Sequence, residues 1–257
     1  MDRIGGRRDG RVPRGEPRRG ADLWRRRARE RRRRRGKLYF SDGQGQARAL
    51  AAGVCYCCKT SLAASADGSI YAVWRHVYPS NIRDIAFTLS RDGGRTFAAP
   101  IRVSEDRWAI DGCPENGPAL AVRGRDVHVL WPTLVTDAAK SEPSLALSYA
   151  VSHDGRTFTP RLRVPTEGTP RHPQLAIGAD GSLLAAWDEA ASGTRRVVAG
   201  RAAAASSAPI HFERQIIASG GTDQYPVVAA TERAAIVAWV SGAAERSVIR
   251  VRRDAVR

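Results

Sequence analysis

Apolar and polar residues alternate in a pattern that recurs four times along the chain. Each copy consists of a short apolar segment, a polar turn and a second apolar segment that contains a tryptophan, at 59–77, 116–134, 171–190 and 224–242. Short alternating segments bounded by turn residues are typical of β-strands. The tryptophans Trp74, Trp131, Trp187 and Trp239 are 57, 56 and 52 residues apart. This regular spacing predicts a repeat architecture with a unit of about 55 residues.

Further apolar segments complete each unit. A third strand is expected after each tryptophan, at 83–90, 144–152, 195–201 and 247–253, and a fourth follows the first three at 96–104, 157–165 and 211–219. Four antiparallel strands per unit, joined by short turns, predict the blades of a β-propeller rather than a sandwich. We therefore expect an all-β, partial propeller of about four blades, with approximate boundaries 37–51 (partial), 55–106, 113–165, 170–219 and 223–257.

The last unit stops after its third strand, and two interpretations of this are open. In the first, the gene has lost its 5′ end, and residues 37–51 are the third and fourth strands of a preceding blade. In the second, the ring closes with four blades, and the 37–51 strands complete the last sheet. The first interpretation predicts marginal stability or self-association through open propeller edges, because uncovered strand edges and apolar faces attract other chains.

Two turns between third and fourth strands share the pattern S-x-D-G-x-T-F, with one extra residue in the first. Their Ser and Asp oxygens are suited to accept backbone N–H groups, Gly supplies a positive φ, and the aromatic ring packs beneath the turn. A carboxylate satisfied in this way is poorly placed for catalysis. We therefore assign a structural role to Ser90, Asp92, Gly94, Thr96, Phe97, Ser152, Asp154, Gly155, Thr157 and Phe158.

These turns resemble the Asp-box, or BNR, repeat of sialidase-like β-propellers, and the resemblance covers about residues 38–257. It implies a glycan-processing or glycan-binding propeller of the exo-α-sialidase (neuraminidase) type, with a glycan or another small ligand at the channel mouth. Such a glycoside hydrolase uses arginines to clamp the substrate carboxylate, an Asp acid and a Tyr nucleophile. The Arg-Ile-Pro element of true sialidases is absent. The alternative is a non-enzymatic BNR-repeat scaffold for protein interactions.

Blade topology predicts where a site would lie. The links into first strands and the loops after second strands share one face, and the S-x-D-G turns lie on the other. Polar, charged and aromatic residues gather in the first set, which makes the channel mouth the candidate site. The resemblance implies catalytic roles for Arg75, Asp84, Asp111 and Tyr225, and substrate binding by His76, Arg83, Glu115, Asn116, Arg171 and His172. Some of these residues are alternatively loop charges or structural pairs such as Arg83 with Asp84.

Two of the four cysteines, Cys55 and Cys113, fall at equivalent places on successive blades. Cys55, Cys57 and Cys58 precede the first complete blade, and Cys113 precedes the second. An even number of cysteines is consistent with a disulfide, and we expect at least one. A thiolate metal site with His76 or His172, and free thiols, are the alternatives. We assign no metal ligand and no cofactor.

Charge is distributed very unevenly along the 257 residues. Residues 1–37 hold sixteen arginines and one lysine against five acidic residues, so 12 of the 16 net positive charges lie there. We expect residues 1–36 to be a disordered basic arm or a mis-assigned start of translation. The nearly neutral body gives no reason to expect a nucleic-acid partner. No apolar run is long enough for a signal peptide or a membrane span, although a disulfide leads us to expect export, to the periplasm or outside the cell, of the full-length form.

Overall fold

The computed structural model describes residues 36–43, 45–136, 142–203 and 210–255. Within these residues the strands form five antiparallel sheets that follow one another along the chain. The first sheet pairs β1 (Lys37–Phe40) with β2 (Arg48–Ala52). The second contains β3 (Ser61–Ala64), β4 (Ile70–Arg75), β5 (Ile85–Ser90) and β6 (Ile101–Arg102).

The other three sheets repeat this strand order. The third contains β7 (Ala119–Arg123), β8 (Asp126–Val135), β9 (Ser144–Ser152) and β10 (Leu162–Val164). The fourth contains β11 (Thr169–Ile177), β12 (Leu183–Ala191), β13 (Thr194–Ala202) and β14 (Glu213–Gly221). The fifth has three strands, β15 (Gln224–Ala230), β16 (Ala234–Ser241) and β17 (Val248–Ala255). Short 3₁₀ helices, η1 (Pro79–Asn81) and η2 (Ala244–Arg246), follow β4 and β16, and no helix in the described ranges is long and apolar enough to cross a membrane.

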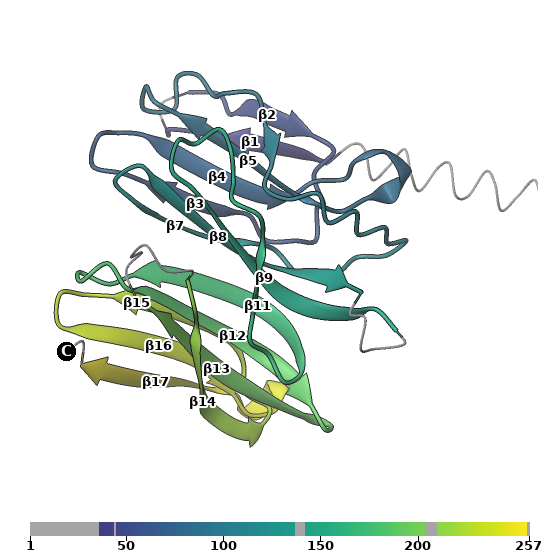
Figure 1. The fold of residues 1–257 in the computed structure, drawn as a ribbon, viewed down its shortest axis with the longest axis vertical. Coiled ribbons are helices and arrows are strands. Elements are labelled where there is room, and N and C mark those ends of the chain that lie inside the picture. Colours follow the sequence, from purple (N-terminus) through teal and green to yellow (C-terminus); the bar gives the residue numbers. More distant parts are fainter. Residues whose placement is uncertain (1–35, 44, 137–141, 204–209, 256–257) are drawn as a thin grey trace, which may run out of the picture.

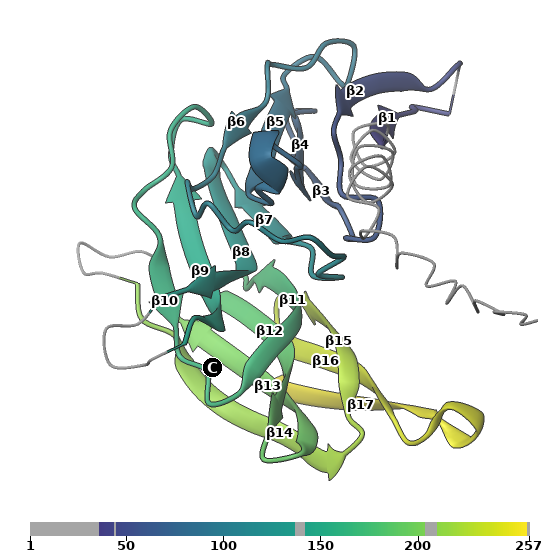
Figure 2. The ribbon, with the colours of Figure 1, turned by 90° about the vertical axis from the view of Figure 1, so that its right-hand side faces the viewer.

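The last four sheets are arranged as the blades of a β-propeller, which confirms the predicted fold class (Figures 1 and 2). We call them blades 1 to 4, and their inner strands β3, β7, β11 and β15 lie next to one another in succession. The β1–β2 sheet and blade 4 occupy opposite ends of the molecule in both views. The predicted disordered arm falls on residues outside the described ranges, apart from Gly36.

The closed-ring interpretation is wrong for the described residues. Strand β1 pairs with β2, β17 pairs with β16, and no described strand continues the sheet beyond β17. Residues 37–51 instead cover blade 1, where Leu38 and Ala51 pack against Val54, Trp74 and Ala86. Among the described strands β17 pairs with β16 alone, and the side chains of Val248, Ile249 and Val251 on β17 are exposed.

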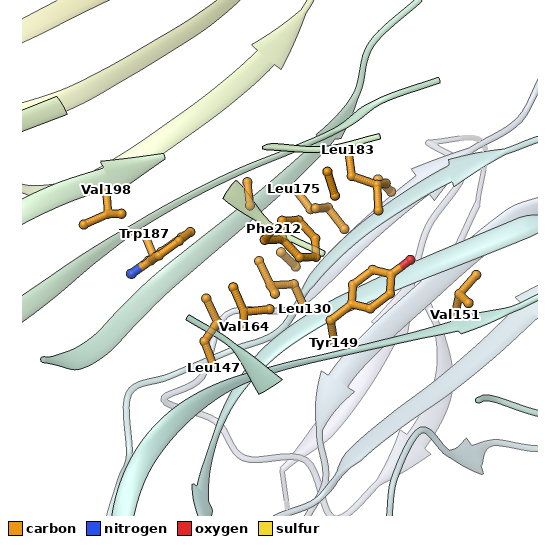
Figure 3. Close-up of a cluster of buried hydrophobic side chains, with 14 residues drawn as sticks. Leu130, Leu147, Tyr149, Val151, Val164, Leu175, Leu183, Trp187, Val198 and Phe212 are labelled. Atoms are coloured by element: carbon orange, nitrogen blue, oxygen red, sulfur yellow. The ribbon is translucent and has the colours of Figure 1, made fainter. Parts of the chain in front are cut away.

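Each repeated tryptophan packs against the sheet that precedes it. Trp131 of blade 2 joins a cluster with Val73 and Phe87 of blade 1, and Trp187 of blade 3 joins one with Leu147 of blade 2 (Figure 3). Burying side chains of this size is a dominant source of stability. The tryptophan period therefore marks the interfaces between blades, and β1–β2 holds the position of a preceding blade relative to Trp74.

The indole N–H of each of the four repeated tryptophans also has a hydrogen-bond acceptor. Trp74 and Trp187 donate to residues two positions further along the chain, His76 Nδ1 at 3.3 Å and Glu189 Oε2 at 3.1 Å. Trp131 and Trp239 instead donate to carboxylates in the links before their blades, and these acceptors are Asp106 Oδ2 at 2.7 Å and Asp223 Oδ1 at 3.0 Å. A buried indole N–H without an acceptor is costly, so these polar groups are part of the core.

The two turns that begin at Ser90 and Ser152, here called the Ser-Asp-Gly turns, have the expected internal bonding. Asp92 Oδ1 accepts the Thr96 N–H at 2.9 Å, and its Oδ2 accepts the Thr96 hydroxyl at 2.6 Å. Asp154 accepts the same two groups from Thr157, at 2.8 and 3.0 Å. The serine hydroxyls accept glycine N–H groups at 2.9 Å in both turns. These carboxylates are occupied by their own turns.

The aromatic residue that ends each of these turns packs on the preceding sheet. The ring of Phe97 lies 5.1 Å from Phe40 of β1, and Phe158 lies 5.3 Å from Phe87 of blade 1. Phe212 of blade 3 continues the series, 5.4 Å from Tyr149 of blade 2. The turns therefore connect neighbouring sheets at one end of the blades, while the tryptophans connect them in the middle.

We expect Asp92→Asn to lower the melting temperature at pH 7. Hydrogen bonds from Thr96 hold the pKa of Asp92 well below its usual range. A carboxyl with a lowered folded-state pKa stabilises above its unfolded pKa of about 3.9, and this contribution is lost as the pH falls further. Thermal melts should show a smaller loss between about pH 4 and about pH 2 for Asp92→Asn than for wild type. Glu245→Gln, at an exposed acid in η2, should match wild type, and equal pH dependence in all three proteins would contradict the assignment.

Candidate functional site

The loops sort onto two faces as the blade topology predicts. The links into β3, β7, β11 and β15 and the described loops after β4, β12 and β16 lie at one end of the blades, here called the mouth face. The Ser-Asp-Gly turns lie at the other end, the turn face, where Arg91 Nη2 of blade 1 donates to Asp154 O of blade 2 at 3.4 Å. The candidate residues named from the sequence lie on the mouth face, where they form two neighbouring clusters.

Arg75 is buried at the end of β4, with 1% of its surface exposed. Its Nε, Nη1 and Nη2 donate to the backbone carbonyls of Asn116, Arg83 and Pro132 at 2.8, 2.6 and 2.6 Å. The guanidinium also lies 4.8 Å from the centroid of a Trp108 ring. Because Asn116 and Pro132 belong to blade 2, this side chain holds blades 1 and 2 together, an arrangement that favours a structural role over a substrate clamp.

Arg83 and Asp84 lie beside Arg75 and do not pair with each other. Arg83, 3% exposed, donates from Nε and Nη2 to Asn81 Oδ1 and from Nη1 to Cys55 Sγ at 3.0 Å. The fully buried Asp84 accepts from Arg102 Nη1 at 3.3 Å, and burial raises its pKa above the usual value. A carboxyl with a raised pKa has the character of a general acid, but no side chain with its exposure reaches a substrate without rearrangement.

The cysteines form the centre of the first cluster, here called the sulfur cluster (Cys55, Cys57, Cys58 and Cys113). Cys57 and Cys113 form a disulfide, which confirms that expectation and connects the links before blades 1 and 2. Cys55 and Cys58 are buried free thiols. The Sγ atoms of Cys55, Cys57 and Cys58 lie within 4.8 Å of one another, but the bonded Cys57 has no thiolate to offer a metal ion.

The second cluster lies where the inner strands of blades 1, 3 and 4 begin, and we call Lys59, His172 and Tyr225 the aromatic cluster. The His172 and Tyr225 rings have centroids 4.3 Å apart, and Lys59 Nζ lies 5.7 Å from the centroid of the Tyr225 ring. Tyr225 is 41% exposed, whereas the His172 side chain is 8% exposed. The arrangement presents one aromatic face and one cation to solvent, which is suited to bind an anionic ligand with apolar ring faces.

Asp188 holds His172 and Tyr225 of the aromatic cluster in position. Its Oδ1 lies 2.7 Å from His172 Nδ1 and accepts the Tyr225 N–H at 3.2 Å, while its Oδ2 accepts Arg195 Nη1 at 3.2 Å. His172 and Tyr225 have φ values of +49° and +53°, so both are strained residues immediately before a proline. One buried carboxylate thus holds two strained residues of different blades in place.

The other candidates lie around these clusters. Buried Asn116 connects them, because its carbonyl accepts Arg75 Nε and its Oδ1 accepts the His172 N–H at 3.4 Å. Asp111 and Glu115 are exposed in the link before β7. His76 packs 4.4 Å from the Tyr78 ring, and burial lowers its pKa. Arg171 is half-buried on β11, and its side chain makes no hydrogen bond or ion pair with another described residue.

Sequence reasoning missed Asp188, Arg195 and Lys59. The signal for Asp188 was present, because it follows Trp187 as Arg75 follows Trp74. Lys59 also stands at the same place in its repeat as His172 and Tyr225 do in theirs, three residues before the aligned apolar residues Leu62, Leu175 and Val228 of the inner strands. Aligning the repeats position by position therefore identifies Asp188 and Lys59, which a search of the loops for reactive residue types does not.

A cavity of about 430 Å³ lies away from these clusters, between blades 3 and 4 at the turn face. Its lining includes Gly200 and Arg214 of blade 3 and Val237, Arg252 and Asp254 of blade 4. The cavity adjoins the edge where blade 4 has three strands instead of four. It therefore reflects the unfilled outer part of blade 4 rather than the chemistry of the mouth face.

No protein-family model matches the chain, and no curated protein matches it. Among solved structures it is similar to the Hadza microbial sialidase Hz136, at 16% identity and a TM-score of 0.52, over 76% of this chain and 44% of the sialidase. It is similar to the Trypanosoma rangeli sialidase at 12% identity and a TM-score of 0.53, over 86% of this chain and 39% of that sialidase. It is also similar to a PL25 ulvan lyase bound to -[GlcA(1-4)Rha3S]-, at 12% identity and a TM-score of 0.50, over 81% of this chain and 55% of the lyase.

The chain thus spans roughly half or less of the length of the solved structures that it resembles. At these identities the similarity concerns the course of the backbone and not the individual site residues. The chain therefore shares the β-propeller fold of carbohydrate-active enzymes, sialidases among them.

Proposed function

We propose that this chain is a sialidase-like Asp-box propeller that binds an acidic glycan at the aromatic cluster. The observation that carries the proposal is the juxtaposition of the half-exposed Tyr225 ring with the Lys59 ammonium and the His172 ring. Sugars present apolar ring faces that stack on aromatic side chains, and an acidic sugar adds a carboxylate that a cation attracts. The similar structures support the glycan class, since two are sialidases and a third holds a saccharide.

Binding is better supported than hydrolysis. A sialidase-type mechanism needs several arginines with free donors around the substrate carboxylate. Arg75 and Arg83 use their donors on protein groups, so of the three candidate arginines Arg171 is left for that role, with Lys59 as a further cation. For hydrolysis, Tyr225 remains the candidate nucleophile, and Asp111 is the exposed candidate acid.

We expect Tyr225→Ala to weaken the binding of an acidic trisaccharide such as sialyllactose by at least about tenfold, which corresponds to about 1.4 kcal/mol. Lys59→Ala should weaken it about threefold at low salt and less at high salt, because the exposed ammonium is screened. Isothermal titration calorimetry with sialyllactose, a glucuronate-containing oligosaccharide and neutral lactose measures both effects. Arg125→Ala removes an exposed cation from the turn face and should leave the affinity unchanged.

The same proteins separate the enzyme from the scaffold. Release of fluorophore from a fluorogenic sialoside by wild type, lost in Tyr225→Phe, would extend the proposal to hydrolysis. Equal affinity for acidic and neutral sugars, or full affinity in Tyr225→Ala, would contradict the acidic-glycan site. Absence of binding to every saccharide would favour the alternative, a non-enzymatic BNR-repeat scaffold for protein interactions.

Export is part of the proposal for the full-length protein. The Cys57–Cys113 disulfide supports it, because such bonds persist in oxidising compartments such as the periplasm and the extracellular space. Self-association through the β17 edge also stays a prediction. Its motivation is the exposed row of Val248, Ile249 and Val251, and size-exclusion chromatography across a concentration series tests it.

A further inference from the structure

The sulfur cluster has a chemistry that glycan binding does not use. It combines one disulfide, Cys57–Cys113, with two free thiols that are 2% and 6% exposed, Cys55 and Cys58. Cys55 and Cys58 are spaced as C-x-x-C, and Cys57 lies between them in the chain. A thiol beside a disulfide is the starting arrangement for thiol–disulfide exchange, provided that the thiol is ionised and in contact with a sulfur of the bond.

Cys55 has the surroundings of a thiolate. Its Sγ accepts the Cys58 thiol at 3.3 Å and Arg83 Nη1 at 3.0 Å. The hydrogen bond from Cys58 and the charges of Arg83 and Arg75 lower the pKa of Cys55, and the same hydrogen bond together with burial raises the pKa of Cys58. The proton therefore stays on Cys58.

The charge balance of the cluster supports the same assignment. Arg83 is buried, and its other hydrogen-bond partner is the neutral side chain of Asn81. No carboxylate lies within ion-pair distance of Arg83 among the residues that the structure describes. A buried guanidinium requires a compensating negative charge or a full set of acceptors, and the Cys55 sulfur is the anion in contact with it.

The Cys55 sulfur also contacts the disulfide, with its Sγ 3.5 Å from Cys57 Sγ. We propose that Cys55 is an internal nucleophile that exchanges with the Cys57–Cys113 disulfide and transfers the free thiol to Cys113. The Cys55 thiolate attacks Cys57 Sγ, a Cys55–Cys57 bond forms, the Cys57–Cys113 bond breaks, and the electron pair leaves on Cys113 as a thiolate. One thiolate and one disulfide exist before and after, so the step needs neither an oxidant nor a reductant.

The exchange alters the mouth face in two ways. Cys113 is exposed whereas Cys55 is buried, so the thiol moves from a buried position to the surface. The cross-link that connects the links of blades 1 and 2 is replaced by a local one within residues 55–57. A surface thiol at this position is then available to a disulfide or another electrophile in solution.

The test is to trap the exposed thiol. Purified, non-reduced wild-type protein is treated with N-ethylmaleimide under native conditions without reductant, and peptides are mapped by mass spectrometry at successive times. We expect label to accumulate on Cys113 together with a Cys55–Cys57 disulfide, because alkylation of Cys113 is irreversible and removes the exchanged form from the equilibrium. In Cys55→Ser, labelling of Cys113 should be at least about tenfold slower.

Cys58→Ser is the matched control, since it removes a buried thiol of the same cluster but keeps the nucleophile and a hydrogen-bond donor to it. Its Cys113 should still be labelled. Circular dichroism checks that both variants are folded, and the disulfide found in labelled wild type decides the question without any variant. Label on Cys55 with the Cys57–Cys113 bond intact, or equal Cys113 labelling in wild type and Cys55→Ser, would overturn the proposal.

Discussion

Arg75→Ala is expected to lower the free energy of unfolding by at least about 4 kcal/mol. The substitution leaves three buried carbonyls, those of Arg83, Asn116 and Pro132, without the guanidinium that now donates to them. An unsatisfied buried carbonyl costs about 1–3 kcal/mol, and a whole domain is stable by about 5–15 kcal/mol. We therefore expect much of the variant to be unfolded or insoluble.

Urea unfolding followed by tryptophan fluorescence measures this loss. Arg75→Lys should lose less stability, because the ammonium keeps the charge and satisfies part of the carbonyl set. Arg107→Ala is the control, since that side chain is 75% exposed and pairs with an exposed Glu105, and we expect a change below about 0.5 kcal/mol. A stable Arg75→Ala variant that had lost hydrolysis of a sialoside would return Arg75 to the catalytic role that the sequence suggests.

Gly117→Ala is expected to destabilise by about 2–4 kcal/mol and to weaken glycan binding as well. A Cβ on Gly117 would lie 2.1 Å from Lys59 O and 3.0 Å from Lys59 N, far inside van der Waals contact. Both partners are backbone, so the strain is relieved only by moving the link before blade 1 away from the link before blade 2. That movement displaces Lys59 from the Tyr225 ring.

Gly112→Ala is the matched control in the same link. Its added Cβ would meet Ile110 at 3.6 Å, an ordinary contact, and we expect nearly wild-type unfolding and binding. Urea unfolding and calorimetry with sialyllactose, run on both variants, measure the two effects. Equal stability of the two variants would show that the close approach of the two links is not maintained in solution.

The strands could be predicted because their signal is local. An apolar segment that ends in tryptophan indicates both a strand and the blade interface that the strand faces. The observed strands β9 and β13 begin and end within one residue of the predicted ranges. The internal bonds of the Ser-Asp-Gly turns are equally local, since Ser90, Asp92 and Thr96 lie within seven residues of one another. Period and turn chemistry therefore sufficed for the architecture.

The function of individual mouth-face residues could not be predicted in the same way. Arg75 reads as a substrate clamp in sequence, but its partners are main-chain carbonyls, and any residue type supplies a carbonyl. The pairing of Cys57 with Cys113 depends on how two links approach each other, which the period does not specify. Whether the edge of the last sheet is open also depends on which strands pair in space. The period is compatible with a closed ring, and the pairing of β1 with β2 excludes it for the described residues.

The two ways of satisfying the tryptophan N–H determine how this chain can be divided into interchangeable parts. Blades 1 and 3 carry their acceptors, His76 and Glu189, two residues after the tryptophan. Blades 2 and 4 borrow Asp106 and Asp223 from the segment upstream. A transplanted or duplicated blade 3 therefore brings its own indole acceptor from β11 onward, whereas blade 2 must be cut before Asp106 to keep its acceptor. A gene segment that is copied together with its indole acceptor is thus longer for blades 2 and 4 than for blades 1 and 3, although the spacing of the tryptophans is nearly constant.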